Sequence, residues 1–230
     1  MPPGCAPRKT SKPIRFRQPT LPGHGPAEAA HGPELADWTD LLVPDLPDGA
    51  LVVGWSLGGL IAMDLALRHP RKVARLALIG ATPRFVATDD WPHGLAAETV
   101  QGFREGFAQD PAAVLRRFVA LQTLGDVRRK AVALALSESL PALGEENAPA
   151  LAEGLRLLAE TDLRTVVGRI SQPVRLLHGE GDALMPPDAA AWLADHLPQG
   201  RLTVLSDCGH APFLSRPADC ATLLAGFADD

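Results

Sequence analysis

The stretch Ala50–Gly59, ALVVGWSLGG, decides the fold class of this chain. Its first six residues form an apolar run of the length of a buried strand, and Leu60–His69 reads as an apolar helix that Pro70 ends. Between strand and helix, residues 54–58 (GWSLG) fit the pattern Gly-x-Ser-x-Gly. A serine on a sharp turn between a strand and a helix predicts a nucleophile whose Oγ stands clear of the sheet.

The residues around this serine suit that chemistry. We expect glycine at positions 54 and 58 to leave space where a Cβ would collide with neighbouring strands. The backbone N–H of Leu57 is expected at the helix N-terminus, where free donors and the helix dipole favour an oxyanion. A glycine-rich turn with an incidental serine is the alternative, and the strand before and the helix after Ser56 disfavour it.

The same alternation of strand and helix continues outward from the turn. Further strands are predicted over Val73–Ala81, Pro173–Gly179 and Arg201–Ser206, and further helices over 188–197 and 217–228. Apolar strands that alternate with helices predict an α/β fold with a mostly parallel central sheet and helices on both faces. We therefore divide the chain into a basic, proline-rich leader (1–18), a core in two parts (19–83 and 169–230) and an inserted helical lid (84–168) that contains no convincing strand.

Two further strand ends supply partners for the serine. A serine alone is a weak nucleophile and needs a base and an orienting acid. Asp182 follows the strand ending near Gly179, and His210 follows the strand ending near Ser206, in the chain order Ser, acid, His. Carboxyl ends of parallel strands carry the sites of open α/β sheets, so we expect Ser56, Asp182 and His210 to meet there.

Other reactive residues are weaker candidates. Asp207 is expected to point away from His210, and Glu180 is a less favoured substitute for Asp182. His178 is expected to be a core histidine with its hydrogen bonds satisfied, and Cys208 a small buried residue. No group has metal-ligand spacing and no dinucleotide or phosphate loop is present, so neither a metal nor a cofactor is expected.

Composition excludes several classes of protein. The chain has 230 residues, of which 46% are hydrophobic and 21% charged, as in an ordinary globular protein. No apolar run reaches the roughly 18 residues of a membrane span. The net charge of −5 argues against nucleic acid as a partner. Three cysteines argue against a disulfide framework and predict a cytoplasmic location.

From about residue 50 onward the chain resembles the α/β-hydrolase superfamily and, within it, the pimeloyl-[acyl-carrier protein] methyl ester esterases of biotin synthesis. The resemblance is carried by residues 54–60 (GWSLGGL), 91–92 (WP), 117–123 (RFVALQT), 162–164 (DLR) and 210–215 (HAPFLS). It implies a serine carboxylesterase that removes the methyl ester from a pimeloyl chain carried on the acyl carrier protein, with no membrane or nucleic-acid partner.

The resemblance also implies roles for particular residues. Ser56 attacks the ester carbonyl, His210 moves the proton, Asp182 holds the imidazole tautomer and Leu57 N–H binds part of the oxyanion. Trp55 is expected at the pocket floor. The acyl-chain contacts of the family fall on Phe118, Val119, Ala120, Leu121 and Gln122.

A cationic stretch of the lid offers partial support for a carrier-protein partner. It contains Arg116, Arg117, Arg128, Arg129 and Lys130, opposed in sequence only by Asp126. Carrier proteins are acidic and their prosthetic arm bears a phosphate, both of which suit arginine. An ordinary solvated helix face is an equally weighted alternative, since the whole lid holds about as many acids as bases.

The N-terminal part departs from the family pattern. Leu21–Gly25 resembles the family's Asp-x-Pro-Gly-x-Gly turn, with Thr20 in place of Asp. The family has two antiparallel strands, a third strand and a His-Gly loop before that turn, and His31-Gly32 follows the turn and cannot replace the loop. We therefore expect an N-terminally truncated sheet in which the strand at 50–55 lacks a neighbour and the second oxyanion donor is missing, a loss worth roughly 10²–10³ in rate. A misassigned start, a decaying copy of the gene, or a leader that refolds into the gap are the three explanations.

Two other functions are compatible with the same residues. A generic short-chain esterase or a C–C bond hydrolase of the same fold is one alternative, which the lid motif disfavours. An inactive truncated remnant that at most binds a carrier protein is another, which the intact Ser56, Asp182 and His210 disfavour.

Overall fold

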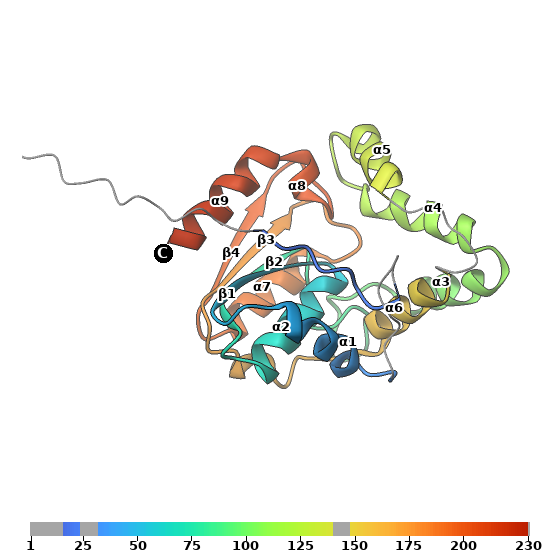
Figure 1. The fold of residues 1–230 in the computed structure, drawn as a ribbon. Coiled ribbons are helices and arrows are strands. Elements are labelled where there is room, and N and C mark those ends of the chain that lie inside the picture. Colours follow the sequence, from blue (N-terminus) through green and yellow to red (C-terminus); the bar gives the residue numbers. More distant parts are fainter. Residues whose placement is uncertain (1–15, 24–31, 140–147, 230) are drawn as a thin grey trace, which may run out of the picture.

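The centre of the molecule is a parallel sheet of four strands in the order β1-β2-β3-β4. A computed structural model describes residues 16–23, 32–139 and 148–229. The strands are β1 (Ala50–Trp55), β2 (Val73–Ile79), β3 (Val174–Gly179) and β4 (Gly200–Leu205) (Figure 1). In register, Trp55 lies opposite Ile79 and Gly179 opposite Leu205, so the strands end at one edge of the sheet. The predicted α/β class with a parallel sheet is confirmed.

Two element boundaries differ from the sequence prediction by two residues or more. Strand β2 ends at Ile79, before the predicted Ala81, because Gly80 turns the chain with φ of 48°. A Cβ at Gly80 would lie 3.0 Å from His210 Nδ1, so this position brings the backbone close to the histidine. The helix predicted from Leu60 begins at Leu57, so most of the motif after Ser56 is already helical.

Strand β1 has one strand neighbour among the described residues, which is β2. The pairing of β1 leaves its other side open, and the Val53 side chain is 50% exposed although it is apolar. Strands β2 and β3 are paired on both sides and bury nearly all their residues. The expectation that the serine-bearing strand would lack a neighbour therefore agrees with the described part of the sheet.

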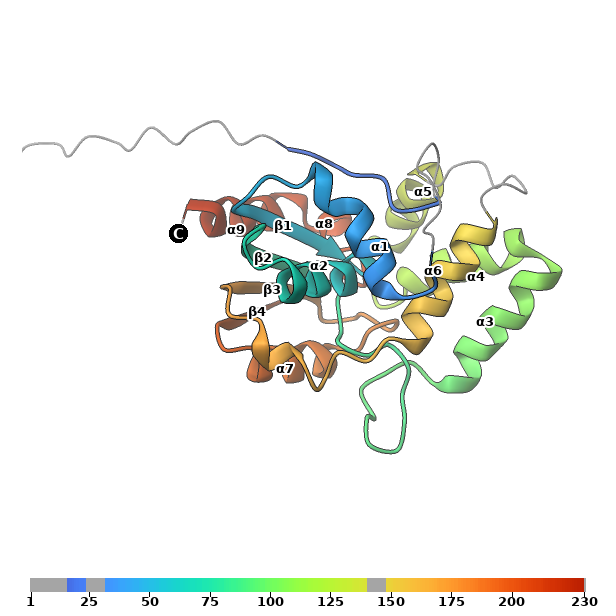
Figure 2. The same ribbon diagram turned by 60° about the horizontal axis from the view of Figure 1, so that its bottom comes forward.

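Helices cover both faces of the sheet. On one face lie α2 (Leu57–Arg68) and α7 (Pro187–His196), with α1 (Leu35–Leu42) outside α2 and the short turns η1 (Val43–Asp45) and η2 (Val167–Arg169) beside them (Figures 1 and 2). The other face carries α8 (Pro212–Ser215) and α9 (Pro217–Asp229), whose Cys220 packs with Leu205 of β4. No helix within these described ranges has the length and apolar character needed to cross a membrane.

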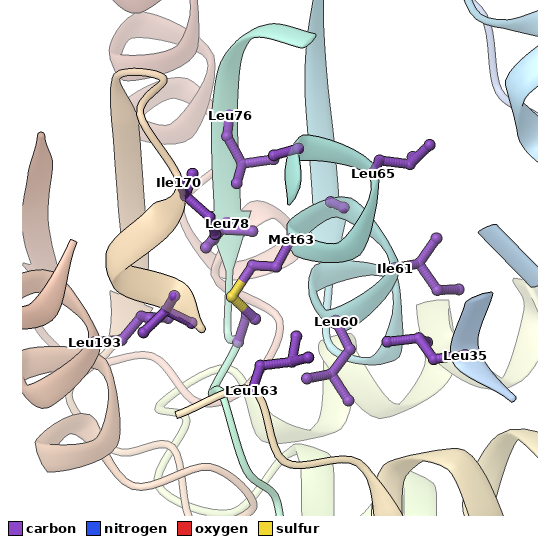
Figure 3. Packing of buried hydrophobic residues seen from close by; sticks show 14 of the residues in the cluster. Leu35, Leu60, Ile61, Met63, Leu65, Leu76, Leu78, Leu163, Ile170 and Leu193 are labelled. Carbon is purple, nitrogen blue, oxygen red and sulfur yellow. The ribbon is translucent and has the colours of Figure 1, made fainter. Parts of the chain in front are cut away.

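The main core lies between the sheet and α2. Met63 is fully buried and points from α2 toward Leu78 of β2, and Leu60 lies toward Leu35 of α1 (Figure 3). Helix α2 is apolar on nearly every side because the sheet, α1 and the lid all pack against it. Such a surrounded helix holds the position of its own N-terminus, where Ser56 lies.

The segment between β2 and β3 forms the predicted helical insertion. It contains α3 (Ala97–Gln109), α4 (Pro111–Gln122), α5 (Arg129–Ser139) and α6 (Ala148–Glu160). These helices extend beyond the carboxyl ends of the strands, over the edge where Ser56 lies (Figures 1 and 2). Within this insertion the described residues form only isolated bridges and no strand.

An ion-pair cluster joins the two ends of the insertion. Arg84 Nη1 donates to Asp162 Oδ2 at 2.5 Å, and Arg164 Nη2 donates to Asp162 Oδ2 at 2.8 Å and to Asp90 Oδ2 at 3.0 Å. The Arg164 guanidinium also lies over the ring of Trp91, 5.4 Å from its centre. Two sequence motifs of the resemblance, Trp-Pro and Asp-Leu-Arg, therefore meet here and fix the base of the lid.

We predict that the free energy of unfolding depends less on pH in Asp162→Asn than in the wild type. Partial burial alone would raise the pKa of Asp162, but hydrogen bonds from Arg164 and Arg84 outweigh it and lower the pKa to about 2 from 3.8. The stabilisation is therefore complete above about pH 5 and is lost as the pH falls toward 2. Chemical denaturation should be measured at several pH values from 7 to 2.5. The variant should have a lower free energy of unfolding than the wild type at pH 7, and this difference should shrink as the pH falls. Asp89→Asn, an exposed neighbour without an ion pair among the described residues, is the control.

Candidate active site

Ser56 occupies a strained turn between β1 and α2. Its φ of 54° and ψ of −121° lie outside the regions that a side chain favours, so the fold must hold the residue there. Ser56 N donates to Ile79 O at 3.1 Å, and Gly59 N donates to Ser56 O at 2.8 Å. Leu57 is the first residue of α2, so its N–H has no partner four residues earlier within the helix. This is the geometry that the serine motif predicts.

The glycines of the motif have different reasons to be glycine. A Cβ at Gly54 would lie 2.3 Å from Gly58 O and 2.8 Å from Ala62 Cβ. A Cβ at Gly58 would meet nothing within 4 Å. The expectation that both glycines prevent collisions with neighbouring strands is therefore wrong for Gly58, and at Gly54 the obstacle is the first turn of α2.

Asp182 lies in the loop after β3 with its carboxylate fully engaged. Its Oδ1 accepts hydrogen bonds from Leu184 N at 3.0 Å and Met185 N at 2.9 Å. Its Oδ2 lies 2.8 Å from His210 Nδ1. Asp182 is 3% exposed and His210 is fully buried, so this contact is shielded from water.

The environment keeps this carboxyl ionised. Burial alone would raise the pKa of Asp182, but the charges and hydrogen bonds of His210 and His178 hold that pKa below its ordinary value. An ionised Asp182 accepts from His210 Nδ1–H, which leaves Nε2 as the ring nitrogen that can exchange a proton with a reacting group.

His210 is held from several sides. Its N–H donates to Gln122 O at 3.2 Å, and its C=O accepts from Trp55 Nε1 at 2.9 Å. The Trp55 and His210 rings lie 5.6 Å apart, which places the histidine beside the residue that precedes Ser56. His210 Nε2 is buried and makes no hydrogen bond with any described residue, so it is available to a reacting group.

The weaker candidates lie apart from this pair or serve it indirectly. Asp207 and Glu180 are exposed. Burial raises the pKa of the Cys208 thiol to about 11, so the reactive thiolate is not formed at neutral pH. His178 is buried as expected, with Nε2 2.7 Å from Met185 O, but it also lies 3.3 Å from Asp182 Oδ2. Sequence reasoning missed this last contact, which depends on the curvature of the loop after β3.

An apolar cavity of about 340 Å³ opens at Ser56. Trp55, Ser56, Leu57 and Gly58 form its floor. Its walls come from the lid helices, with Phe103 and Phe107 of α3, Val114, Leu115 and Phe118 of α4, and Leu151, Leu155 and Leu158 of α6. Ser56 and Gln122 are the polar side chains of the lining, and no charged one lies among the described residues there. The volume is within the roughly 300–1,000 Å³ of small-molecule sites.

The structure places only some of the predicted acyl contacts of α4 at the cavity. Phe118 and Gln122 line the cavity, but Val119, Ala120 and Leu121 do not. Five consecutive residues of a helix cannot face one cavity, because each is rotated about 100° from the last. Val119 packs instead against Val132 and Ala211, and Ala120 faces solvent. The residues missed, on α3 and α6, gave no signal beyond apolar periodicity.

The cationic residues of the lid lie on its outer surface. Arg116, Arg117, Arg128, Arg129 and Lys130 are all exposed. Arg117 lies over the Phe103 ring at 5.3 Å, and the other four form no ion pair with the described residues. Across residues 16–23, 32–139 and 148–229, no three acidic, histidine or cysteine side chains are grouped to hold a metal ion.

The fold and the site together define an α/β hydrolase: a parallel sheet, a strained serine between strand and helix, and a buried acid–histidine pair in the loops after β3 and β4. The family model described as alpha/beta hydrolase fold matches residues 19–217. Among solved structures, an esterase from Exiguobacterium antarcticum superposes with a TM-score of 0.79 at 22% identity, covering 91% of this chain and 80% of that one. That likeness concerns the fold alone.

Curated relatives are closer in sequence. The chain is 58% identical over 216 residues to a pimeloyl-[acyl-carrier protein] methyl ester esterase of Aromatoleum aromaticum, covering 92% of this chain and 86% of the relative. It is 41% identical over 208 residues to the protein of the same name in Nitrosomonas europaea, covering 90% of this chain and 82% of that relative. The chain therefore belongs to the α/β-hydrolase family and, within it, to the group of these esterases.

We predict that Gly54→Ala destabilises the protein and that Gly58→Ala does not. The first Cβ collides with backbone that cannot move without shifting α2, at a cost of about 1–3 kcal/mol. The second enters open space. Thermal unfolding should place Gly54→Ala several degrees below wild type, at roughly 2–4 °C per kcal/mol for a chain of this size. Equal melting temperatures for the two variants would contradict the assigned packing.

Proposed function

We propose that this chain is a serine carboxylesterase that hydrolyses the methyl ester of pimeloyl-[acyl-carrier protein] in biotin synthesis. The observation that carries the mechanism is the buried Asp182–His210 pair, 2.8 Å apart, whose histidine lies against Trp55, the residue before Ser56 in the cavity lining. The names of the relatives supply the substrate. The buried free thiols of Cys208 and Cys220 support a cytoplasmic site of action.

The geometry suits acyl transfer in two steps. Ser56 Oγ attacks the ester carbonyl as His210 Nε2 takes its proton, and Leu57 N–H donates to the developing oxyanion. The carbonyl re-forms, and the methoxy group leaves as methanol with the proton from His210. Water, deprotonated by His210, then attacks the acyl-serine, and Ser56 Oγ leaves with the proton from His210, which releases the free carboxylate on the carrier-bound chain. Asp182 stabilises the imidazolium in both steps without becoming protonated.

The cavity suits a neutral chain. A pimeloyl group that is a methyl ester at one end and a thioester at the other carries no charge, so an apolar lining costs it no desolvation of an ion. Hydrolysis creates a carboxylate, which this lining disfavours. The same wall therefore favours the entry of the ester and the departure of the product.

The outer surface of the lid suits an acidic partner that delivers the chain. We infer that Arg116, Arg117, Arg128 and Arg129 contact the acyl carrier protein. Arg128, Arg129 and Lys130 stand together at the start of α5, and exposed Val127 and Leu134 add apolar surface next to them. Asp126, the acid beside them in sequence, is buried and does not neutralise them.

The alternatives have less support. A generic esterase or C–C hydrolase would share the fold but gives no reason for 58% identity with a carrier-protein esterase. An inactive remnant would have no need of the strained Ser56, which costs stability.

We predict that Ser56→Ala abolishes activity without unfolding the protein. Removal of the nucleophile should lower kcat for a methyl ester by about 10⁴–10⁶-fold. Capture by a fluorophosphonate, read by intact mass, should disappear. Ser171→Ala, which changes an exposed serine before β3, should label as wild type does. Labelling that persists in Ser56→Ala would assign the nucleophile elsewhere.

We predict that the double variant Arg128→Glu/Arg129→Glu weakens use of the carrier-bound ester only. KM for the carrier-bound methyl ester should rise ~10-fold or more at low salt, because like charges then face the carrier. kcat/KM for p-nitrophenyl acetate should not change, and added salt should narrow the difference.

The matched control for this variant is Arg71→Glu/Arg169→Glu. It changes the net charge equally at exposed positions near the opposite ends of the strands. An equal loss in the control would mean that overall charge, and not a docking surface on the lid, governs the carrier-bound reaction.

A further inference from the structure

The turn between α4 and α5 (residues 123–128) contacts both loops that carry the acid and the histidine. Val127 N donates to Asp207 O at 3.2 Å, three residues before His210. Gly125, with φ of 75°, lies so close to Gly181 that a Cβ would be 2.1 Å from Gly181 O. The lid therefore touches the site through its backbone as well as through the cavity wall.

Asp126 is the buried charge at the centre of this contact. It is 7% exposed. Its Oδ2 accepts hydrogen bonds from Gly209 N at 3.1 Å and from the Ser215 hydroxyl, and its Oδ1 accepts from Arg128 N at 2.7 Å. No described cation pairs with it. A buried carboxylate without a cation depends on such donors, and hydrogen bonds to a charged acceptor are short and strong.

The donors connect Asp126 to the chain on both sides of His210. Gly209 is the residue before His210, and Ser215 ends the short helix α8, which begins two residues after His210. Gln122 O and Trp55 Nε1 hold the N–H and C=O of His210 itself. Together these groups fix the backbone from which the imidazole reaches Asp182.

We propose that Asp126 is a positioning residue for His210. Through Asp126, the packing of the lid against the core determines the orientation of the catalytic base. The proposal rests on the proposed function only in that His210 acts there as the base. Apolar packing already holds the lid against this part of the core, since Val119, Val132 and Leu136 of the lid pack against Ala211 beside the histidine. A role in folding alone would therefore not require a carboxylate at position 126. A carboxylate at this position adds directional bonds, which fix geometry and not merely contact.

A graded set of variants tests this proposal with p-nitrophenyl acetate as substrate. Asp126→Ala removes every acceptor, Asp126→Asn keeps one side-chain oxygen, and Ser215→Ala removes one donor. Because a shift of about 1 Å costs up to about 10²-fold, we expect kcat losses of ~100-fold, ~10-fold and a few-fold in that order. KM should not change, since the cavity lining is intact.

The control is Asp64→Asn, which changes another carboxyl of similar burial, 9% exposed, paired with Arg68 away from both loops. It should lower the melting temperature and leave kcat as in wild type. Active-site titration with a fluorophosphonate corrects each kcat for folded protein. Hydrogen–deuterium exchange of the Gly209 and His210 amides should accelerate in the Asp126 and Ser215 variants and not in Asp64→Asn.

Three results would overturn the proposal. The first is an unchanged kcat in Asp126→Asn, and the second is a loss of kcat in Asp64→Asn as large as that in Asp126→Asn. The third is a rise in KM, in place of a fall in kcat, in the Asp126 variants. If neither Asp126 variant folds, Ser215→Ala decides, and unchanged kcat and amide exchange there reject the proposal. Wild-type protein that cleaves p-nitrophenyl acetate but not the carrier-bound ester refutes the proposed substrate and leaves the role of Asp126 standing. Wild-type protein that cleaves neither ester refutes both.

Discussion

The carboxylate of Asp182 is buried, and much of the surrounding structure serves to keep it ionised and in place. Two backbone amides of its own loop bind one oxygen, and His210 and His178 face the other. A buried charge that lost these partners would either take up a proton or force the loop open. His210 in turn depends on this charge for its tautomer. The loops after β3 and β4 therefore have to be held together.

The lid takes part in that arrangement. Helix α4 offers an apolar face to the cavity, and its last carbonyl accepts the N–H of His210. The turn after it brings Asp126 to Gly209, and α5 then presents cations to solvent. One insertion thus meets the acyl chain, the histidine backbone and the outer surface. The ion pairs of Arg84, Asp162 and Arg164 hold the two ends of the insertion together at the base of the lid.

The sequence was informative where local chemistry dictates structure. The apolar run before Ser56 and the glycines after it specify a strand, a turn and a helix within a few residues, so the turn could be predicted. The parallel sheet could also be predicted, because apolar runs that alternate with helices form parallel sheets. Asp182 and His210 could be chosen because each directly follows such a run. His178 and Asp126 could not, since their partners lie in loops that only the folded chain brings near.

The sequence by itself determined the class of the protein: an α/β sheet, a serine turn, an acid and a histidine at strand ends, and an insertion made of helices. These features depend on periodicity and on short motifs, which act within a few residues. Only the tertiary structure decided which face of α4 meets the cavity, which glycine is sterically required and which carboxylate of the lid reaches the histidine. Helix rotation and packing between distant segments settle such contacts, and neither is written in any local stretch of the chain.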